Sequence, residues 1–350
     1  MSEPVLSIRD LVVRLSTSRG VVHAVNGVSL DVESGAAVGL VGESGSGKSV
    51  TSLAILRLLP RGGRIVSGEV WFAGRDLTRL PAAEMRAVRG REIAMILQDP
   101  QSSLNPVLPV GEQIEEAIRA HEPVSRRAAR ARAIELLGAV GIARPGEQLG
   151  RFPHQFSGGM RQRVMIAIAL ALRPRLLIAD EPTTALDVTV QAQVLELLRE
   201  LTDEVGAAVV LISHDLGIMA RMTRRISVMY AGRVVESAPT DVLFARPRHP
   251  YTVGLLHSIP RIGSERQALV PIEGAPPDLE RLPEGCPFAP RCAWRVQTCW
   301  SANPPLSPDG TPEHVVACHN PVEPEEIGAG RPVRAGFTRA APPGAREGVA

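Results

Sequence analysis

The sequence of 350 residues has few aromatic side chains, little net charge and no long apolar run. Aromatic residues make up 3% of the chain and the formal net charge is +2, so neither stacking platforms nor a concentrated basic face for nucleic acid is expected. No stretch reaches the roughly 18 consecutive apolar residues of a transmembrane helix. The first residues lack the basic and apolar regions of a signal peptide. We therefore expect a cytoplasmic protein that binds no nucleic acid.

Cysteine is scarce and confined to one proline-rich segment. The four cysteines are Cys286, Cys292, Cys299 and Cys318, spaced C-x5-C-x6-C-x18-C. A disulfide framework is disfavoured in a reducing compartment, whereas four thiolates suit a metal. The spacing matches neither zinc pairs about two to four residues apart nor the ferredoxin pattern C-x2-C. The residues alone leave an iron–sulfur cluster, zinc and free thiols open.

Short apolar runs alternate with helical patterns along most of the chain. Residues 37–41, 176–179 and 209–212 are apolar without alternation, as in strands buried on both faces. Strands that alternate with helices predict an α/β core with a mostly parallel sheet. A helical block from about residue 98 to 155 is predicted to be an insertion, with Pro145 ending its helical pattern.

A glycine-rich loop follows the first of these strands. It fits the pattern G-x-x-x-x-G-K-S/T with Gly42, Glu43, Ser44, Gly45, Ser46, Gly47, Lys48 and Ser49. Glycines let backbone N–H groups converge on a phosphate, and a helix N-terminus favours the anion. Lys48 is expected to reach the β- and γ-phosphates and Ser49 to bind Mg²⁺. The alternative is a plain turn with an exposed lysine, but the position between a strand and a helix favours phosphate binding.

Two acids stand where another apolar strand ends. Asp180 and Glu181 follow residues 176–179, and ligands of open α/β sheets bind at the carboxyl ends of strands. Asp180 is therefore predicted to hold Mg²⁺, and Glu181 to polarise a water for attack on the γ-phosphate. A solvated acidic pair is the alternative, which the phosphate loop on the same chain disfavours.

Further segments resemble motifs of the ABC transporter ATPases, in the order of that family. Residues 96–100 (ILQDP) resemble its Q-loop, residues 156–162 (FSGGMRQ) its signature motif, residues 185–187 (ALD) its D-loop and residues 212–215 (ISHD) its H-loop. The match covers about residues 5–240. The chain departs from the family at Met160, where glutamine is usual, and it lacks the usual aromatic residue that stacks on adenine; candidates to replace that residue are Leu15, Arg19 and His23.

The resemblance implies a P-loop NTPase fold with a RecA-like core, an antiparallel β subdomain and the helical insertion. It implies ATP as nucleotide and Mg²⁺ held by Ser49, Gln98 and Asp180. In the family's scheme Gln98 relays the nucleotide state to membrane subunits, and His214 contacts the γ-phosphate and orients the water of Glu181. Two ATPase subunits, identical or different, pair head to tail. The residues implied to complete the nucleotide site are Ser157, Gly158, Gly159, Met160 and Asp187.

Residues from about 241 to 320 resemble the C-terminal extension of oligopeptide, dipeptide and nickel importer ATPases. That resemblance favours a 4Fe-4S cluster on the four cysteines, with zinc as the alternative. The cluster would act as a staple for an appendix too small to form its own core. Residues 321–350, rich in proline, glycine and alanine, are expected to be disordered.

The resemblance implies an ATP-hydrolysing importer subunit that powers uptake of di- or oligopeptides from the cytoplasmic face of the membrane. The partners it implies are a second ATPase subunit, two transmembrane permease subunits and an extracytoplasmic solute-binding protein. A nickel importer is left open, because the ATPase does not touch the solute. A non-transport ABC ATPase is disfavoured, because the chain has neither a long coiled-coil insertion nor a second cassette.

Overall fold

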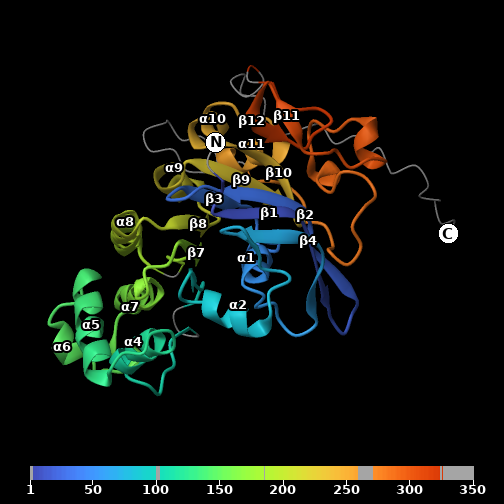
Figure 1. The fold of residues 1–350 in the computed structure, drawn as a ribbon. Helices are drawn as coiled ribbons and strands as arrows, with labels where there is room; N and C mark the ends of the chain where they lie inside the picture. The colour runs from blue at the N-terminus through green and yellow to red at the C-terminus, as the bar shows by residue number, and fades with distance from the viewer. Residues whose placement is uncertain (1–2, 100–102, 185, 259–270, 324, 326–350) are drawn as a thin grey trace, which may run out of the picture.

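The chain folds around a large mixed sheet, with a smaller antiparallel sheet across it (Figure 1). The computed structural model describes residues 3–99, 103–184, 186–258, 271–323 and 325. The strands of the large sheet lie in the order β11 (Ser307–Asp309), β12 (Thr311–Val316), β10 (Arg233–Pro239), β9 (Arg225–Tyr230), β3 (Ala37–Val41), β8 (Ala208–Ile212), β7 (Leu176–Asp180) and β6 (Ile93–Ile96). The strands from β9 to β6 run parallel, which confirms the predicted α/β core.

The smaller sheet packs on one face of the parallel strands. Its strands lie in the order β2 (Val21–Val32), β1 (Leu6–Ser16), β4 (Gly63–Phe72) and β5 (Arg75–Asp76), all antiparallel. Buried residues such as Leu6 and Phe72 share one apolar cluster with Ile55 of α1 (Lys48–Ile55) and Ile178 of β7. Helix α2 (Ala82–Val88) adds Met85 to the same cluster. The hairpin of β1 and β2 thus holds α1, which begins at the glycine-rich loop.

The helical insertion lies to one side of the sheets (Figure 1). Its helices are α4 (Val110–Arg119), α5 (Arg126–Ala139) and α6 (Pro145–Gln148), followed by the 3-10 turn η1 (Pro153–Gln155). The prediction that Pro145 ends the helical pattern is wrong. Helix α5 ends before it, and Pro145 begins α6, where its missing N–H costs nothing because first-turn N–H groups have no partner within the helix.

Three helices lie in the connections between the parallel strands. Helix α7 (Gly158–Leu170) leads into β7, α8 (Val188–Val205) leads from β7 to β8, and α9 (Leu216–Met222) leads from β8 to β9. Helices α7 and α8 lie side by side in Figure 1 and contact each other.

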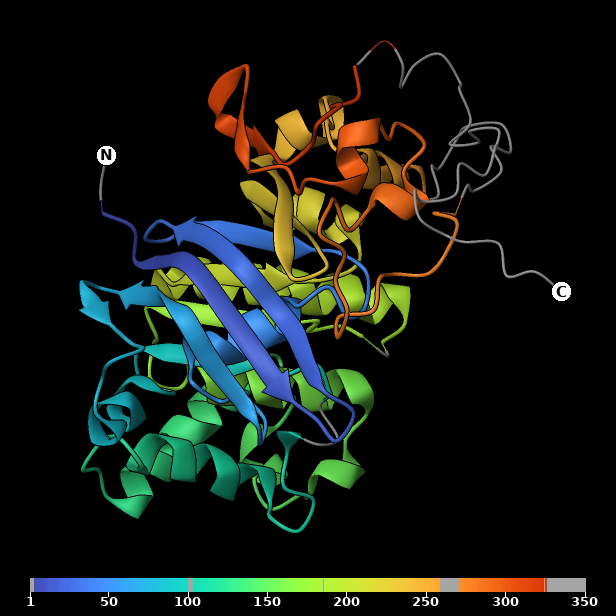
Figure 2. The ribbon, with the colours of Figure 1, turned by 90° about the vertical axis from the view of Figure 1, so that its right-hand side faces the viewer.

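The C-terminal extension is continuous with the main sheet. It contains α10 (Thr240–Ala245), α11 (Pro250–His257) and the 3-10 turns η2 (Ala289–Arg291) and η3 (Gln297–Trp300). Its strand β12 pairs with β10, and its Tyr251 and Phe288 join the apolar cluster that contains residues of the parallel strands. Figure 2 shows the extension, in orange and red, above the blue antiparallel sheet. The extension therefore shares the core of the rest of the chain.

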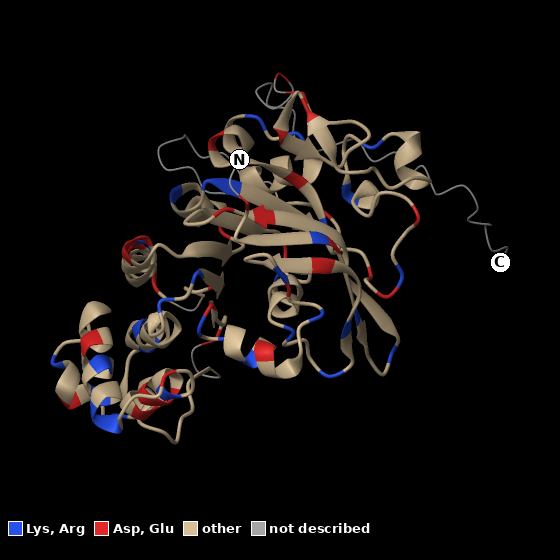
Figure 3. Ribbon diagram, in the orientation of Figure 1, with Lys and Arg blue, Asp and Glu red and all other residues tan. Residues whose placement is uncertain are grey.

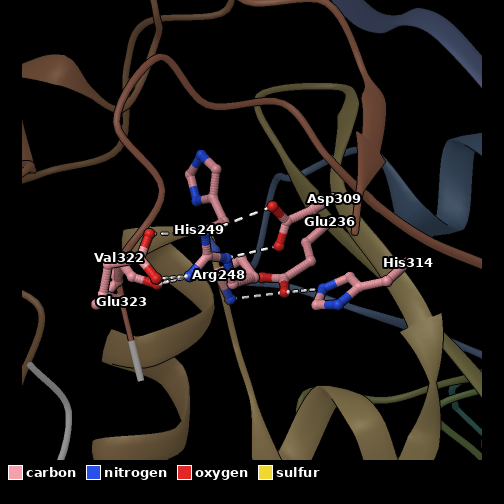
Figure 4. A network of polar contacts seen from close by, with 7 residues as sticks. All are labelled: Glu236, Arg248, His249, Asp309, His314, Val322 and Glu323. Atoms are coloured by element: carbon pink, nitrogen blue, oxygen red, sulfur yellow. Dashed lines mark hydrogen bonds and ion pairs between the residues drawn. The ribbon is translucent and has the colours of Figure 1, made fainter. Parts of the chain in front are cut away.

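A buried polar network fixes the extension to β10 (Figure 4). The Glu236 carboxylate is fully buried. It accepts hydrogen bonds from the backbone N–H groups of Arg248 and His249, at 2.8 and 2.9 Å, and lies 2.8 Å from Nε2 of His314. The Arg248 guanidinium pairs in turn with Asp309 and with Glu323, at 2.6 and 2.8 Å. Because each partner comes from a different element, the network ties β10, β11, β12 and the start of α11 together.

The start of the C-terminal tail contacts the extension. Val322 is fully buried and its N–H donates to the Arg248 carbonyl, whereas most of the tail predicted to be disordered, residues 326–350, lies outside the described residues. Basic and acidic residues are interspersed on the elements seen in Figure 3. Within the described ranges no helix is long and apolar enough to span a membrane.

Candidate nucleotide site

The glycine-rich loop runs from the end of β3 into α1, as the sequence predicts. Gly47 has φ +103°, and a Cβ added there would lie 2.4 Å from the Ala24 carbonyl oxygen. At Gly42 an added Cβ would lie 2.2 Å from the Met229 carbonyl oxygen. Neither position can accept a side chain without moving a backbone. The loop is therefore packed against β2 and β9, with its N–H groups grouped at the start of a helix.

The Lys48 side chain folds back over this loop. Its Nζ donates to the carbonyl oxygens of Gly42 and Glu43, at 2.7 and 3.0 Å. Burial lowers the pKa of Lys48, and the nearby charges of Glu181 and Asp180 act in the opposite direction. The ammonium thus lies between the loop and the two acids at the end of β7.

Asp180 and Ser49 form the part of the site that suits a metal ion. Asp180 is 4% exposed and burial raises its pKa, while a hydrogen bond from the Ser49 hydroxyl acts the other way. In the described part of the chain, Oδ1 of Asp180 is buried without a hydrogen-bond partner. A carboxylate oxygen left unpaired beside a hydroxyl fits Mg²⁺, which prefers oxygen ligands.

Glu181 lies where three segments meet. Its Oε2 accepts hydrogen bonds at 2.9 Å from Nε2 of Gln98 and from the Thr184 hydroxyl. Its Oε1 lies 3.4 Å from Nδ1 of His214. The backbone of Glu181 has φ +47°, a left-handed conformation that is uncommon for this residue type and is found at functional sites. The structure thus brings together the Gln98, Glu181 and His214 side chains that the sequence identifies separately.

The signature residues lie at the exposed N-terminus of α7. Ser157 caps this helix by accepting from the Met160 N–H at 3.4 Å, and Asp187 caps α8 by accepting from the Val190 N–H at 3.0 Å. A Cβ at Gly159 would lie 2.6 Å from Val190, so α7 and α8 approach closely only because this position has no side chain. Among the described residues, no hydrogen bond joins the signature to the phosphate loop. Ala185 and Pro100 of the D-loop and Q-loop lie outside the described residues.

The candidates for a base contact occupy different surroundings. Leu15 packs against the apolar core, and Arg19 is exposed. The His23 N–H donates to the Leu279 carbonyl at 2.9 Å, so this strand is held by the extension.

The extension also reaches the phosphate loop, which the sequence analysis did not anticipate. The Arg291 guanidinium pairs with the Glu43 carboxylate through two hydrogen bonds of 2.7 and 2.9 Å. The two residues lie 248 positions apart, and no local pattern marks such a pair.

The expected 4Fe-4S cluster is a wrong prediction, and zinc finds no support either. In the residues that the structure describes, no group of three or more histidine, cysteine, aspartate or glutamate side chains is arranged to hold a metal ion. Cys292 belongs to the apolar core and Cys286 packs against it. Burial raises the pKa of Cys292 and of Cys318 to about 12, and neighbouring thiols add to the shift. Burial thus favours the protonated form of these two thiols when no metal is bound.

Comparison with known proteins gives two family matches. Residues 25–184 match the model described as ABC transporter, and residues 235–299 match the model described as oligopeptide/dipeptide transporter, C-terminal region. The second match contains Arg291 and three of the four cysteines.

Individual relatives match over most of their length. The dipeptide transport ATP-binding protein DppD of Bacillus subtilis is 51% identical, over 85% of this chain and 89% of that protein. The oligopeptide transport ATP-binding protein OppD of Escherichia coli is 47% identical, over 92% of this chain and 95% of that protein. A solved structure of a dimeric ATP-binding cassette in a post-hydrolysis state, bound to ADP and phosphate, has a TM-score of 0.60 and 29% identity, over 67% of this chain and 98% of that one.

Proposed function

The chain belongs to the ABC ATPases of the oligopeptide and dipeptide transporter branch, and from this premise we propose that it hydrolyses ATP to drive uptake of di- or oligopeptides. The observation that carries the proposal is the meeting of Gln98 and His214 on the Glu181 carboxylate, beside Asp180 and the phosphate loop. Such a group suits hydrolysis of a phosphoanhydride.

The loop and Lys48 bind the phosphates of the nucleotide. The N–H groups at the start of α1 face the anion, and the Lys48 ammonium exchanges its two carbonyl partners for phosphate oxygens. Ser49 and Asp180, with Gln98, would hold Mg²⁺, which supplies charge neutralisation at the phosphates. The unpaired Oδ1 of Asp180 supports this assignment.

Glu181 acts as the base for the attacking water. Its carboxylate takes the proton at an Oε atom while the oxygen of the water attacks the γ-phosphorus. Gln98 and Thr184 fix the orientation of the carboxylate through Oε2, which leaves Oε1 toward His214. His214 in turn orients the water and contacts the γ-phosphate. The exposed side chain of His214 can make both contacts, because it lies at the rim of the site.

A second ATPase subunit completes the site. The N-terminus of α7 is exposed, and the Ser157 hydroxyl that accepts from the Met160 N–H still has a proton to donate, an arrangement suited to phosphate. The proposal places Ser157, Gly158, Gly159 and Met160, with Asp187, against the nucleotide of the partner subunit. The similarity to a cassette solved as a dimer supports it.

The protein works at the cytoplasmic face of the membrane with two permease subunits and a solute-binding protein. The helical insertion, residues 98–155, is the proposed docking surface for a permease. Exposed apolar side chains at its entry, Leu97 at 43% and Val107 at 74%, support this role. Because Gln98 directly follows Leu97 and donates to Glu181, docking and hydrolysis share one segment.

The test uses Glu181→Gln in the chain reconstituted with its permeases and binding protein. The variant should bind ATP with unchanged affinity and lose at least about 100-fold in turnover, since the amide cannot accept the proton. ATP-driven uptake of a labelled dipeptide should be lost with it. Glu33→Gln, at an exposed carboxylate, is the matched control and should retain both activities.

Two results would contradict the proposal. Near-normal hydrolysis by Glu181→Gln would remove the assignment of the base. Uptake of radiolabelled nickel without uptake of peptide would retain the ATPase and reject the peptide cargo.

A further inference from the structure

The extension holds the phosphate loop through one residue, Glu43. The Glu43 carboxylate accepts two hydrogen bonds from Arg291. Its backbone N–H donates to the Tyr251 hydroxyl at 2.7 Å, and its carbonyl accepts from Nζ of Lys48 at 3.0 Å. The side chain and both backbone polar groups of Glu43 are therefore engaged, two of them by the extension and one by the phosphate-binding lysine.

Hydrogen-bond acceptors and aromatic rings surround the Arg291 guanidinium. Its side chain is 4% exposed. Besides the two bonds to Glu43, its Nε donates to the Glu273 carbonyl, one Nη to the Tyr230 hydroxyl and the other Nη to the Ile272 carbonyl, at 3.0, 3.2 and 3.2 Å. The rings of Tyr230 and Phe288 lie 5.8 and 5.9 Å from the guanidinium carbon. All five N–H groups of the guanidinium thus have acceptors, which fixes its plane.

The second contact, from Tyr251, is equally fixed. Tyr251 is fully buried, and its ring packs against Tyr230 and Phe288 with centroids 4.7 and 5.4 Å apart. Burial raises the pKa of its hydroxyl above the ordinary value, so the group stays neutral and can accept the Glu43 N–H. That N–H is consequently turned toward the extension.

The Arg291 side chain is 4% and the Glu43 side chain 27% exposed. An ion pair that is largely buried is weak evidence for stability, because desolvation of the charges offsets their attraction, and such pairs are better known for fixing one conformation. Here the ion pair fixes the conformation of Glu43, the second residue of the phosphate loop, whose carbonyl accepts from Lys48. We propose that Arg291 is a positioning residue for nucleotide binding, through which the C-terminal extension sets the conformation of the phosphate loop. This inference rests on the proposed ATP site.

Loss of the pair should weaken nucleotide binding more than chemistry. Without Arg291 the Glu43 carboxylate is released and the loop no longer presents one arrangement to the phosphates, whereas Gln98, Glu181 and His214 keep their mutual contacts. Arg291→Gln should raise the KM for ATP and the Kd for MANT-ATP about tenfold or more, with kcat changed no more than about twofold. The loss should be the same for ADP and GDP analogues, since the phosphates and not the base are affected.

The experiment measures these constants on the full chain for Arg291→Gln, Arg291→Lys, Glu43→Gln and the double variant Arg291→Gln/Glu43→Gln. The lysine variant should remain impaired, because one ammonium cannot bond both carboxylate oxygens in the same plane. The double variant should be no worse than Arg291→Gln, since both changes remove one interaction. Arg281→Gln, at an exposed arginine of the same extension, removes the same charge and should bind nucleotide normally.

The variants distinguish a loss of folding from a loss of positioning by Arg291. Thermal unfolding identifies variants that are folded, and Glu43→Gln carries the test if Arg291→Gln does not fold, because it leaves the other acceptors of Arg291 in place. Folded variants with unchanged KM and Kd would overturn the positioning role. A wild-type chain that binds MANT-ATP without hydrolysing it would count against the proposed function, while the comparison of Kd values would still test Arg291.

Discussion

The buried imidazole of His249 should make the stability of the protein fall as the pH falls. His249 is 1% exposed and caps α11, because its Nδ1 accepts the Tyr251 N–H at 3.1 Å. Its ring packs against Phe288, with centroids 5.8 Å apart. Burial lowers the pKa of His249 from 6.5 to about 4, although the Glu236 carboxylate favours the charged form. The folded protein therefore holds a neutral ring at neutral pH.

The sign and size of the effect follow from these two values. Between about pH 6.5 and about pH 4 the unfolded chain binds a proton at this ring that the folded chain does not, so the free energy of unfolding decreases as the pH decreases. At about 1.4 kcal/mol for each pKa unit, the whole window costs about 3 kcal/mol. About 2 kcal/mol of this is lost between about pH 7.5 and about pH 5.

His249→Asn isolates this contribution. Asparagine is a strong N-cap that can accept the same backbone N–H, and it does not titrate. Urea unfolding of both proteins at about pH 7.5 and about pH 5, followed by the fluorescence of Trp294 and Trp300 in the extension, gives the change with pH for each. Any cost of the smaller side chain is present at both pH values and cancels. The variant should lose about 2 kcal/mol less than the wild type on acidification.

An exposed histidine, His154, provides the matched control. His154→Asn, at an exposed histidine, should show the same pH dependence as the wild type. If the wild type and His249→Asn lose equal stability between the two pH values, the neutral buried ring is not the source of the acid sensitivity and the reasoning is refuted.

Two further perturbations test the nucleotide site. Gly47→Ala places a Cβ 2.4 Å from the Ala24 carbonyl at φ +103° and should weaken MANT-ATP binding at least about 100-fold, whereas Gly146→Ala, with nothing within 4 Å of an added Cβ, should bind normally. Ser157→Arg and Lys48→Ala should each abolish ATP hydrolysis alone. For a chain that pairs with itself, an equimolar mixture should regain about a quarter of wild-type activity, because half of the dimers are mixed and contain one intact site. A mixture as inactive as its components would contradict a site shared between subunits.

The sequence predicted the strand, loop and helix of the candidate phosphate site because these elements are local. A strand, a glycine-rich loop and a helix succeed one another in the chain, and backbone conformation at Gly42 and Gly47 is set by the residues present. The ends of parallel strands meet at one edge of a sheet, so Asp180, Glu181 and His214 could be assigned to the same edge from their positions after apolar runs. The order of the motifs carried the family.

Two predictions, for the cysteines and for Pro145, are wrong because the local pattern does not decide them. The resemblance of the extension favoured a 4Fe-4S cluster, but Cys292 lies in the apolar core, Cys286 packs against it, and no metal-holding group is found among the described residues. The sequence pattern predicts a helix end at Pro145. Pro145 begins α6 instead, because a proline fits equally at a helix start.

By itself, then, the sequence determined the position of the glycine-rich loop between a strand and a helix, the acids at a strand end and the ATPase family, because each depends on residues that are close together in the chain. Only the tertiary structure decided that β12 of the extension pairs with β10 of the main sheet. It alone also showed that residues of the extension bind the buried Glu236 and that Arg291 forms an ion pair with Glu43. The reason is physical. Contacts between residues 248 positions apart depend on how whole elements pack, and no periodicity or motif in a single sequence records that packing.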